Sequence, residues 1–364
     1  MKKSMISCAR MSRVVFFGGV VALLSSFALP AHAVTIDWVT VGDPGNTADT
    51  APAGYGDVAT SFQIMKYEFT NQQYTDFLNS VDASGTNPNS VYNASMGSDA
   101  RGGISFTSGA ASGSKYAIRT DMGDKPVNYV SWFDAARVSN WLMNGGTSSS
   151  STETGAYTLI GGQTSGTAPA VNSGATVYIP TEDQWYKAAY YKGGSTNAGY
   201  WDYATQSDSA PTAVTSGTTG IGSSGSTGNF ANYNLAADWN SRNGNVTTVG
   251  TNGGANAYNA FDMSGNLREW NDLTGATGSS RGRRGGSWGN DASDLSSSLR
   301  SSVVPSDETS SIGFRLASPV AVPEPSTCAM ALAGLACGCY TLVRRRRRNP
   351  RNPGRERFSA PGLI

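Results

Sequence analysis

Cysteine and histidine, the side chains that most often bind transition metals or act as nucleophile and base, stand only near the two ends of this 364-residue chain. The one histidine is His32, and the four cysteines are Cys8, Cys328, Cys337 and Cys339. Residues 34–318 contain neither type, so they can form no disulfide, no thiol nucleophile, no Ser-His-Asp triad and no metal site built on imidazole or thiolate. Carboxylate chemistry, oxygen-ligated metals and binding without catalysis remain open to them.

Two carboxylates on either side of a glycine, Asp262 and Glu269, are candidates for such chemistry. Two acidic side chains could serve as the acid and base of a glycosidase. The alternative is that Glu269 forms a salt bridge with an arginine.

The charge of residues 34–318 is negative, with 15 Lys and Arg against 24 Asp and Glu and a net charge of −9. A domain this acidic has no electrostatic footprint for nucleic acid, which is not expected as a partner. The only local concentration of basic side chains is Arg281, Arg283, Arg284, Arg300 and Arg315. We expect these arginines to be solvated or salt-bridged rather than to form an anion site.

The first 33 residues have the organisation of a secretory signal peptide. Basic residues precede an apolar run at 14–29, and Ala31 and Ala33 match the pattern that signal peptidase accepts. The mature protein is therefore expected to begin near Val34. An uncleaved N-terminal anchor is the alternative, although the apolar run is short for a bilayer span.

The C-terminal residues 319–348 resemble a PEP-CTERM sorting signal of Gram-negative bacteria. Pro323, Glu324 and Pro325 precede an apolar segment at 327–343 and five arginines at 344–348, and a basic tail follows at 349–364. At a rise of ~1.5 Å per residue the apolar segment covers roughly 25 Å, the lower end of what spans a bilayer. The arginines would stay in the cytoplasm and hold the domain outside.

This resemblance implies an exosortase-type enzyme as a processing partner. It also implies a location at the cell envelope or surface, with a membrane anchor before sorting and release into the exopolysaccharide matrix after cleavage. The alternative is a plain C-terminal anchor that no sortase cuts.

Three segments predict helices that open in the same way. A hydroxyl residue that can accept an amide hydrogen bond is followed three positions later by a longer polar side chain, and apolar residues then recur at helical spacing. The three pairs are Thr70 with Gln73, Ser131 with Asp134, and Thr181 with Gln184.

Strands are predicted at 62–68, 176–179, 285–288 and 313–316, and long Gly/Ser/Thr/Asn loops at 144–175 and 207–228. The expected fold is α+β with little regular secondary structure, in which many Trp and Tyr side chains pack together.

Five segments, in order, resemble the formylglycine-generating enzyme family, also called the sulfatase-modifying factor family. They are M-K-Y-E-F-T-N-Q-Q-Y at 65–74, P-V-N-Y-V-S-W at 126–132, I-P-T-E-D-Q-W at 179–185, F-D-M-S-G-N-L-R-E-W at 261–270, and R-G-G-S-W at 284–288 with I-G-F-R at 312–315. The resemblance spans residues 34–318. It implies a single C-type-lectin-like domain with three main helices, a small twisted sheet and irregular loops.

The family's enzymes oxidise a sulfatase cysteine to formylglycine with two cysteines that bind copper. The family spacing from Trp288 places Asn290 and Leu295 at those two positions. Neither side chain offers the thiolate that copper(I) prefers, so copper is not expected and no catalytic residue is predicted. A related branch that uses non-haem iron needs several histidines, which residues 34–318 also lack.

Calcium is the cofactor that the resemblance still allows. By analogy with the family, one site would use the side chains of Asp262 and Glu269 and the carbonyls of Gly265 and Leu267. A second would begin at Asn232 and Tyr233, with Asp238 as a further contributor.

Three functions are therefore open. The first is a surface-displayed, non-catalytic module that binds a glycan or a protein through the loop aromatic residues Trp201, Tyr203, Trp239 and Trp288. The second is an enzyme, either a sulfatase-modifying-type oxidase or another carboxylate-based activity. The third is a structural component of the extracellular matrix.

Overall fold

The computed structural model describes residues 34–52 and 54–320, which belong to one compact unit that begins at Val34. The predicted signal peptide, the Pro323-Glu324-Pro325 motif, the apolar segment at 327–343 and the basic tail lie outside the described residues. Within the described ranges no helix has the length and apolar character needed to cross a membrane.

The three predicted helices are confirmed, and each begins with the expected capping box. The hydroxyl groups of Thr70, Ser131 and Thr181 accept the backbone N–H three residues later, and the side chain there accepts the backbone N–H of the cap in return. These helices are α1 (Asn71–Val81), α3 (Trp132–Met143) and α4 (Glu182–Tyr190). Two further single turns were not predicted, namely α2 (Ser95–Ser98) and a 3₁₀ turn, η1 (Ala292–Leu295).

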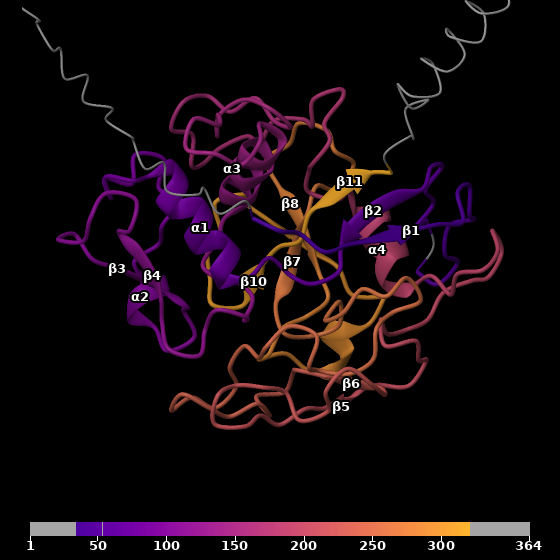
Figure 1. The fold of residues 1–364 in the computed structure, drawn as a ribbon. Coiled ribbons are helices and arrows are strands. Elements are labelled where there is room, and N and C mark those ends of the chain that lie inside the picture. The colour runs from indigo at the N-terminus through magenta and orange to yellow at the C-terminus, as the bar shows by residue number, and fades with distance from the viewer. Residues whose placement is uncertain (1–33, 53, 321–364) are drawn as a thin grey trace, which may run out of the picture. The chain divides into compact units, whose positions relative to one another are not determined.

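The strands form two principal sheets rather than one. In the first, β2 (Phe62–Met65) lies between β1 (Trp38–Val41) and β11 (Ala317–Pro319), and both pairings are antiparallel. The second sheet has the order β10-β7-β8-β9, with β7 and β8 near the centre of the view in Figure 1. Its strands are β7 (Arg268–Asn271), β8 (Arg281–Arg284), β9 (Ser301–Val303) and β10 (Ile312–Gly313).

Two small pairs of strands complete the sheets of the described residues. They are β3 (Ile104–Phe106) with β4 (Tyr116–Ile118), and β5 (Thr212–Ala213) with β6 (Phe230–Ala231). The last pair lies among the long loops at the bottom of Figure 1. Short strands, few helices and long loops confirm the predicted α+β fold with little regular structure.

Two strand predictions are confirmed only in part, because the strand predicted at 62–68 ends at Met65 and only Gly313 of the segment 313–316 lies in a strand. The other two, at 285–288 and 176–179, are wrong. The segment at 285–288 is a turn rather than a strand, because Gly285 and Gly286 have φ angles of 92° and 69°, which end β8 at Arg284. The segment at 176–179 forms only a single bridge, from Tyr178 to Ala317. Both segments resemble strands in composition, but glycine conformation and the available partner determine pairing.

Large aromatic side chains fill the core, as the composition predicted. Trp132, Trp141, Trp185 and Trp270 are all at most 1 % exposed. One core cluster joins α1 and α3, where Phe69 stacks on Phe314 with ring centres 5.0 Å apart. A second cluster surrounds α4 and the first sheet. Each cluster contains residues from distant parts of the sequence. Packing of these residues therefore holds the intervening loops, including those that carry the site, in fixed positions.

Candidate functional site

Asn290 and Leu295, which the family spacing predicts at the positions of the copper-binding cysteines, both follow β8, and their environments differ. Asn290 is half-buried in the turn after β8. Its Oδ1 accepts hydrogen bonds from the Ser287 backbone N–H (3.0 Å) and hydroxyl (2.7 Å), and its Nδ2 donates to Asp294 (3.1 Å). Asn290 therefore holds the turn together through three polar contacts.

Leu295, by contrast, is fully buried at the end of η1. Its Cδ1 atom lies so close to Gly286 that a Cβ there would approach to 2.6 Å. This volume is filled by an apolar side chain, and no second polar ligand faces Asn290 from this position.

A cleft of about 350 Å³ opens beside Asn290. This volume is within the range typical of small-molecule sites, roughly 300–1,000 Å³. We call it the Asn290 cleft, and its lining residues are Leu235, Arg268, Ser287, Trp288, Gly289, Asn290, Ser310 and Ser311. Hydroxyl, amide and backbone groups dominate this lining, alongside one aromatic ring and one cation.

Trp288 is fixed in the wall of the Asn290 cleft. Its Nε1 donates to the Ser310 carbonyl (3.1 Å), and the guanidinium of Arg101 lies 3.9 Å from its ring centre. Arg101 is itself held by the carbonyls of Asn243 and Gly244. The loop at 234–235 is also tied to this turn, because its backbone N–H groups donate to the carbonyls of residues 290 and 288. The cleft is thus preformed by contacts between four separate loops.

The other three aromatic residues predicted as ligand contacts do not line this cleft. Trp239 is only 6 % exposed and packs in a small core cluster with Met122, Val246 and Leu267. Trp201 is partly exposed beneath the ammonium group of Lys192, and Tyr203 is partly exposed nearby in the sequence. Only Trp288 combines an exposed ring surface with a cleft.

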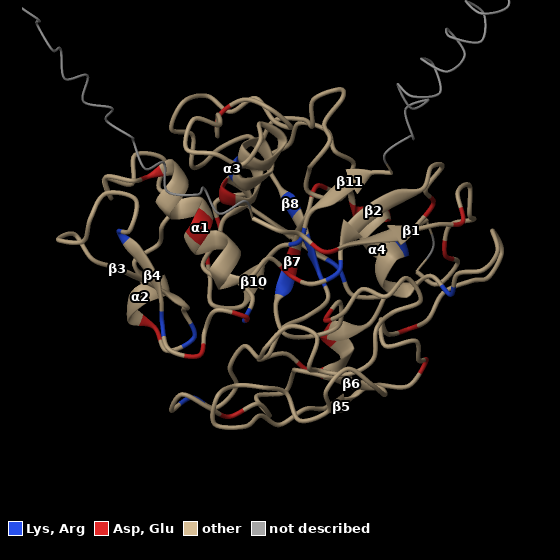
Figure 2. Cartoon of the chain, in the orientation of Figure 1, with Lys and Arg blue, Asp and Glu red and all other residues tan. Residues whose placement is uncertain are grey.

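The five clustered arginines are all ion-paired, as expected. Figure 2 shows ribbon segments of Lys and Arg (blue) on β7 and β8 near the centre of the view, close to segments of Asp and Glu (red). The pairs are Arg281 with Asp272, Arg283 with Asp307, Arg284 and Arg300 with Glu182, and Arg315 with Glu269. The group therefore offers no shared anion site.

Glu269, predicted as a calcium ligand, is committed to Arg315. Both residues are fully buried, and the two guanidinium–carboxylate contacts are 2.6 Å each. The Nε1 of Trp185 donates to the same carboxylate at 2.7 Å. Both carboxylate oxygens of Glu269 already accept hydrogen bonds, so this side chain suits the ion pair with Arg315 better than it suits a metal ion. Its burial also removes the acid–base alternative with Asp262, since no substrate can reach it.

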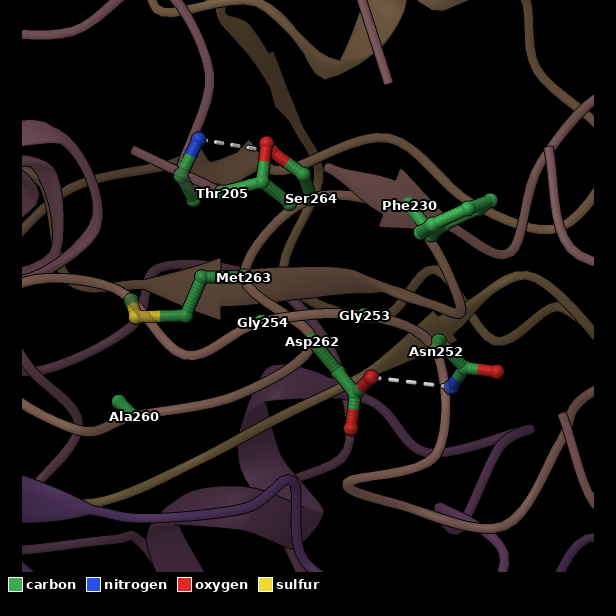
Figure 3. Close-up of a pocket in the computed structure, with 10 residues that line it drawn as sticks. Thr205, Phe230, Asn252, Gly253, Gly254, Ala260, Asp262, Met263 and Ser264 are labelled. Carbon is green, nitrogen blue, oxygen red and sulfur yellow. Dashed lines mark hydrogen bonds between the residues drawn. The ribbon is translucent and has the colours of Figure 1, made fainter. Parts of the chain in front are cut away.

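Asp262 lies close to this pair but has partners of its own. Its two oxygens accept hydrogen bonds from Gly250 (2.5 Å) and Asn252 (2.9 Å). Burial raises the pKa of its carboxyl even though both donors oppose this effect. Figure 3 shows Asp262 beside a cavity of about 10 Å³, the size of one water molecule or small ion. The other predicted ligands of this set, Gly265, Leu267 and Glu269, do not line that cavity.

Sequence reasoning did not single out Glu68, although it lies inside the first family segment. Its oxygens accept hydrogen bonds from Asn266 Nδ2 (2.8 Å) and the Leu267 N–H (3.1 Å), which hold the turn of the predicted calcium site. Burial raises the pKa of Glu68 well above its usual range, and the charges of Asp262 and Glu269 raise it further. The carboxylates of Glu68, Asp262 and Glu269 therefore all interact electrostatically with the buried guanidinium of Arg315.

The second predicted calcium set has one feature that suits a cation. Asn232 is buried, and its Nδ2 donates to three oxygens, from Asn245, Thr247 and Asn266. Its Oδ1 is buried without a hydrogen-bond partner. The Tyr233 carbonyl accepts the Ala236 N–H (3.2 Å), and Asp238 is exposed. An unpartnered buried oxygen is a group that a hard cation could satisfy. Among residues 34–52 and 54–320 no cluster of three or more His, Cys, Asp or Glu is placed to hold a metal ion.

Comparison with known proteins agrees with these observations. The sequence profile of the sulfatase-modifying factor enzyme 1-like domain matches residues 32–320, and that of the PEP-CTERM protein-sorting motif matches residues 321–348. The sorting motif marks an exported, envelope-associated protein that is processed by exosortase-type machinery. No curated protein sequence matches the chain significantly.

Several solved structures are similar over most of their length. Treponema denticola variable protein 1 has 18 % identity and a TM-score of 0.44, covering 80 % of this chain and 98 % of its own. CarF has 22 % identity and a TM-score of 0.45, covering 79 % of this chain and 99 % of its own. PvdO from Pseudomonas aeruginosa has 18 % identity and a TM-score of 0.38, covering 79 % of this chain and 93 % of its own.

The family match covers most of the chain, and the confirmed helix caps, the turn at 262–267 and the buried pair of Glu269 with Arg315 lie inside its segments. The chain therefore belongs to the sulfatase-modifying factor enzyme 1-like domain family.

Proposed function

We propose that this protein is a non-catalytic binding module displayed at the cell envelope, and that its ligand site is the Asn290 cleft. The observation that carries the proposal is the contrast between the two family cysteine positions. One is an asparagine that braces an open cleft of about 350 Å³, and the other is a leucine buried in the core. A cleft is therefore present next to Asn290, although neither Asn290 nor Leu295 supplies a thiolate ligand for copper.

A glycan suits the lining of this cleft better than an apolar ligand does. Ser310 and Ser311 supply hydroxyl groups, and Trp288 supplies a flat apolar surface. Sugars combine hydroxyl groups with apolar C–H faces, so both kinds of surface would be used. A protein loop is the second candidate, and the exposed side chain of Leu235 at the rim favours it.

An array of glycans and peptides tests this function with the full chain, exported and purified in detergent. We expect binding to at least one glycan and a loss of at least tenfold for Trp288→Ala, about 1.4 kcal/mol or more. Trp201→Ala is the matched control, since Trp201 is partly exposed but lies outside the cleft. Binding to peptides alone would favour the protein ligand, and no binding by folded protein would refute the proposal.

The enzymatic alternative has its own test. Incubation of the full chain with copper and a cysteine peptide derived from a sulfatase is expected to give no formylglycine. Copper-dependent turnover would overturn the non-catalytic proposal.

We further propose that calcium is the cofactor and that it binds at Asn232 and Tyr233 rather than at Asp262 and Glu269. The unpartnered Oδ1 of Asn232 supports the first set, and the pairing of Glu269 with Arg315 argues against the second. Bound calcium would stabilise the loops at 232–247 that border the Asn290 cleft, because a ligand that binds only the folded state raises its stability.

Chelation is therefore expected to lower the melting temperature of the full chain, and Ca²⁺ but not Mg²⁺ should restore it. The shift with EDTA should disappear in Asn232→Ala and persist in Asp262→Asn. An identical melting curve with and without EDTA in the unmodified protein would rule calcium out, and the reverse pattern in the two variants would place the ion at Asp262.

A further inference from the structure

Arg268 is the only cation that lines the Asn290 cleft, and it is incompletely paired. It is the first residue of β7, and its side chain is 23 % exposed. One nitrogen, Nη2, donates to Asp294 Oδ1 at 3.1 Å. Within the described part of the chain, its guanidinium forms no other hydrogen bond or ion pair. The remaining N–H donors of the fork are thus available on a side chain that borders the cleft.

The neighbouring residues hold Arg268 in place. The second oxygen of Asp294 accepts a hydrogen bond from Asn290 Nδ2 (3.1 Å), and Asn290 is tied to Ser287. Arg268, Asp294, Asn290 and Ser287 therefore form a continuous chain of contacts along the cleft wall. A ligand that binds Arg268 needs to immobilise less of its side chain, which reduces the entropic cost of binding.

The local charge also differs from that of the acidic domain. Both oxygens of Asp294 are occupied, and the guanidinium of Arg101 lies against Trp288 on carbonyl partners without an ion pair in the described residues. No carboxylate is among the residues that line the Asn290 cleft, although Asp99 interacts with Arg101 and Asp291 follows Asn290 in the chain. The Asn290 cleft is thus a place where an anionic group can approach a protein that is otherwise negative.

We propose that the Asn290 cleft binds an acidic glycan, and that Arg268 binds the carboxylate of a uronic acid residue. This inference rests on the glycan-binding function proposed above. A carboxylate accepts charge-assisted hydrogen bonds from the N–H groups of a guanidinium, and such bonds are about twice as strong as hydrogen bonds between neutral groups. A neutral sugar would remove water from part of the charged guanidinium without supplying a negative charge to pair with it, which is unfavourable. The sugar ring would lie against Trp288, with its hydroxyl groups near Ser310 and Ser311.

The test compares three oligosaccharides of equal length on the full chain: oligogalacturonate, its methyl ester, and the neutral product of carboxyl reduction. We expect at least tenfold tighter binding of oligogalacturonate than of the other two, and a decrease of this preference at high salt. This comparison needs no variant and therefore does not depend on whether a substitution folds.

Variants then locate the preference. Arg268→Gln should remove it, and Arg268→Lys should retain only part of it, because a lysine lacks the planar fork. Arg242→Gln is the control with the same change in net charge, since Arg242 is 48 % exposed and does not line the cleft. A melting curve for each variant verifies that it folds.

The outcomes separate this inference from the function on which it rests. Equal binding of the acidic and neutral oligosaccharides, unaffected by Arg268→Gln, would refute the role of Arg268 while leaving a glycan-binding cleft. A preference that Arg242→Gln removes and Arg268→Gln leaves intact would also refute it. Binding of no glycan in the array would refute the binding function itself.

Discussion

Substituting Arg315 by methionine is expected to destabilise the folded protein by about 3–5 kcal/mol. The substitution leaves Glu269 fully buried without the guanidinium that contacts both of its oxygens at 2.6 Å. It also removes the only buried cation beside Glu68 and Asp262. Urea denaturation of the full chain measures the effect, provided that the slope of the transition is unchanged.

Arg300→Met is the control for this prediction. Arg300 also pairs with a buried carboxylate, Glu182, but its side chain is 42 % exposed and Arg284 shares the same partner. Its substitution should cost about 0–1 kcal/mol. A second control is the double variant Arg315→Met with Glu269→Gln, which removes the unpaired charge and should regain part of the loss. Equal effects for Arg315→Met and Arg300→Met would contradict a structural role for the buried pair.

The same substitution should change the pH dependence of stability. Burial and the neighbouring carboxylates raise the pKa of Glu68, and Arg315 opposes this rise. A carboxyl whose pKa is higher in the folded state supports stability below its unfolded pKa and loses that support as pH rises through the folded pKa. Without Arg315 the pKa of Glu68 rises further. The free energy of unfolding of the variant should therefore fall more steeply than that of the unmodified protein as the pH rises above the ordinary range of a carboxyl pKa.

Truncating Leu295 to alanine is expected to cost about 2–5 kcal/mol, because it opens a cavity in a position with no exposed surface. The branched end of this side chain packs on Gly286, where an added Cβ would lie 2.6 Å from the Leu295 Cδ1 atom. Thermal or urea unfolding of the full chain measures the loss. The result bears on function, since a large effect identifies this position as core rather than as part of a site.

Leu299→Ala provides a matched comparison four residues later. Leu299 is 37 % exposed, so the same truncation should cost less than about 1 kcal/mol. If Leu295→Ala proved as mild as Leu299→Ala, the side chain at 295 would not fill the family's catalytic volume. The distinction between a filled position and an open cleft would then be lost.

The fold was predictable wherever its determinants are local. The capping boxes at Thr70, Ser131 and Thr181 each involve residues three positions apart, and all three helices begin where these residues predict. Strand positions were predicted less well, since the pairing of Tyr178 with Ala317 depends on a segment more than a hundred residues away. The turn at Gly285 and Gly286 shows the same limit, because composition does not reveal which glycines adopt positive φ.

The environment of the candidate site could not be predicted from the sequence. Family spacing singled out Asn290 and Leu295, yet only the tertiary structure shows that one borders a cleft and the other is buried. Arg268 and Asp294, which are 26 residues apart, gave no signal in the sequence. Nor did Glu68, which reaches Asn266 across 198 residues.

Composition by itself determined that residues 34–318 have no thiol and no imidazole, so these residues cannot supply thiolate or imidazole ligands to a metal whatever the fold. The tertiary structure decided what the remaining polar residues do. Glu269 accepts hydrogen bonds from the guanidinium of Arg315, 46 residues further along the chain. The buried Oδ1 of Asn232, by contrast, has no hydrogen-bond partner within the described residues. The reason is physical: the absence of a functional group requires no geometry, whereas the role of a carboxylate depends on which donors folding brings within about 3 Å of it.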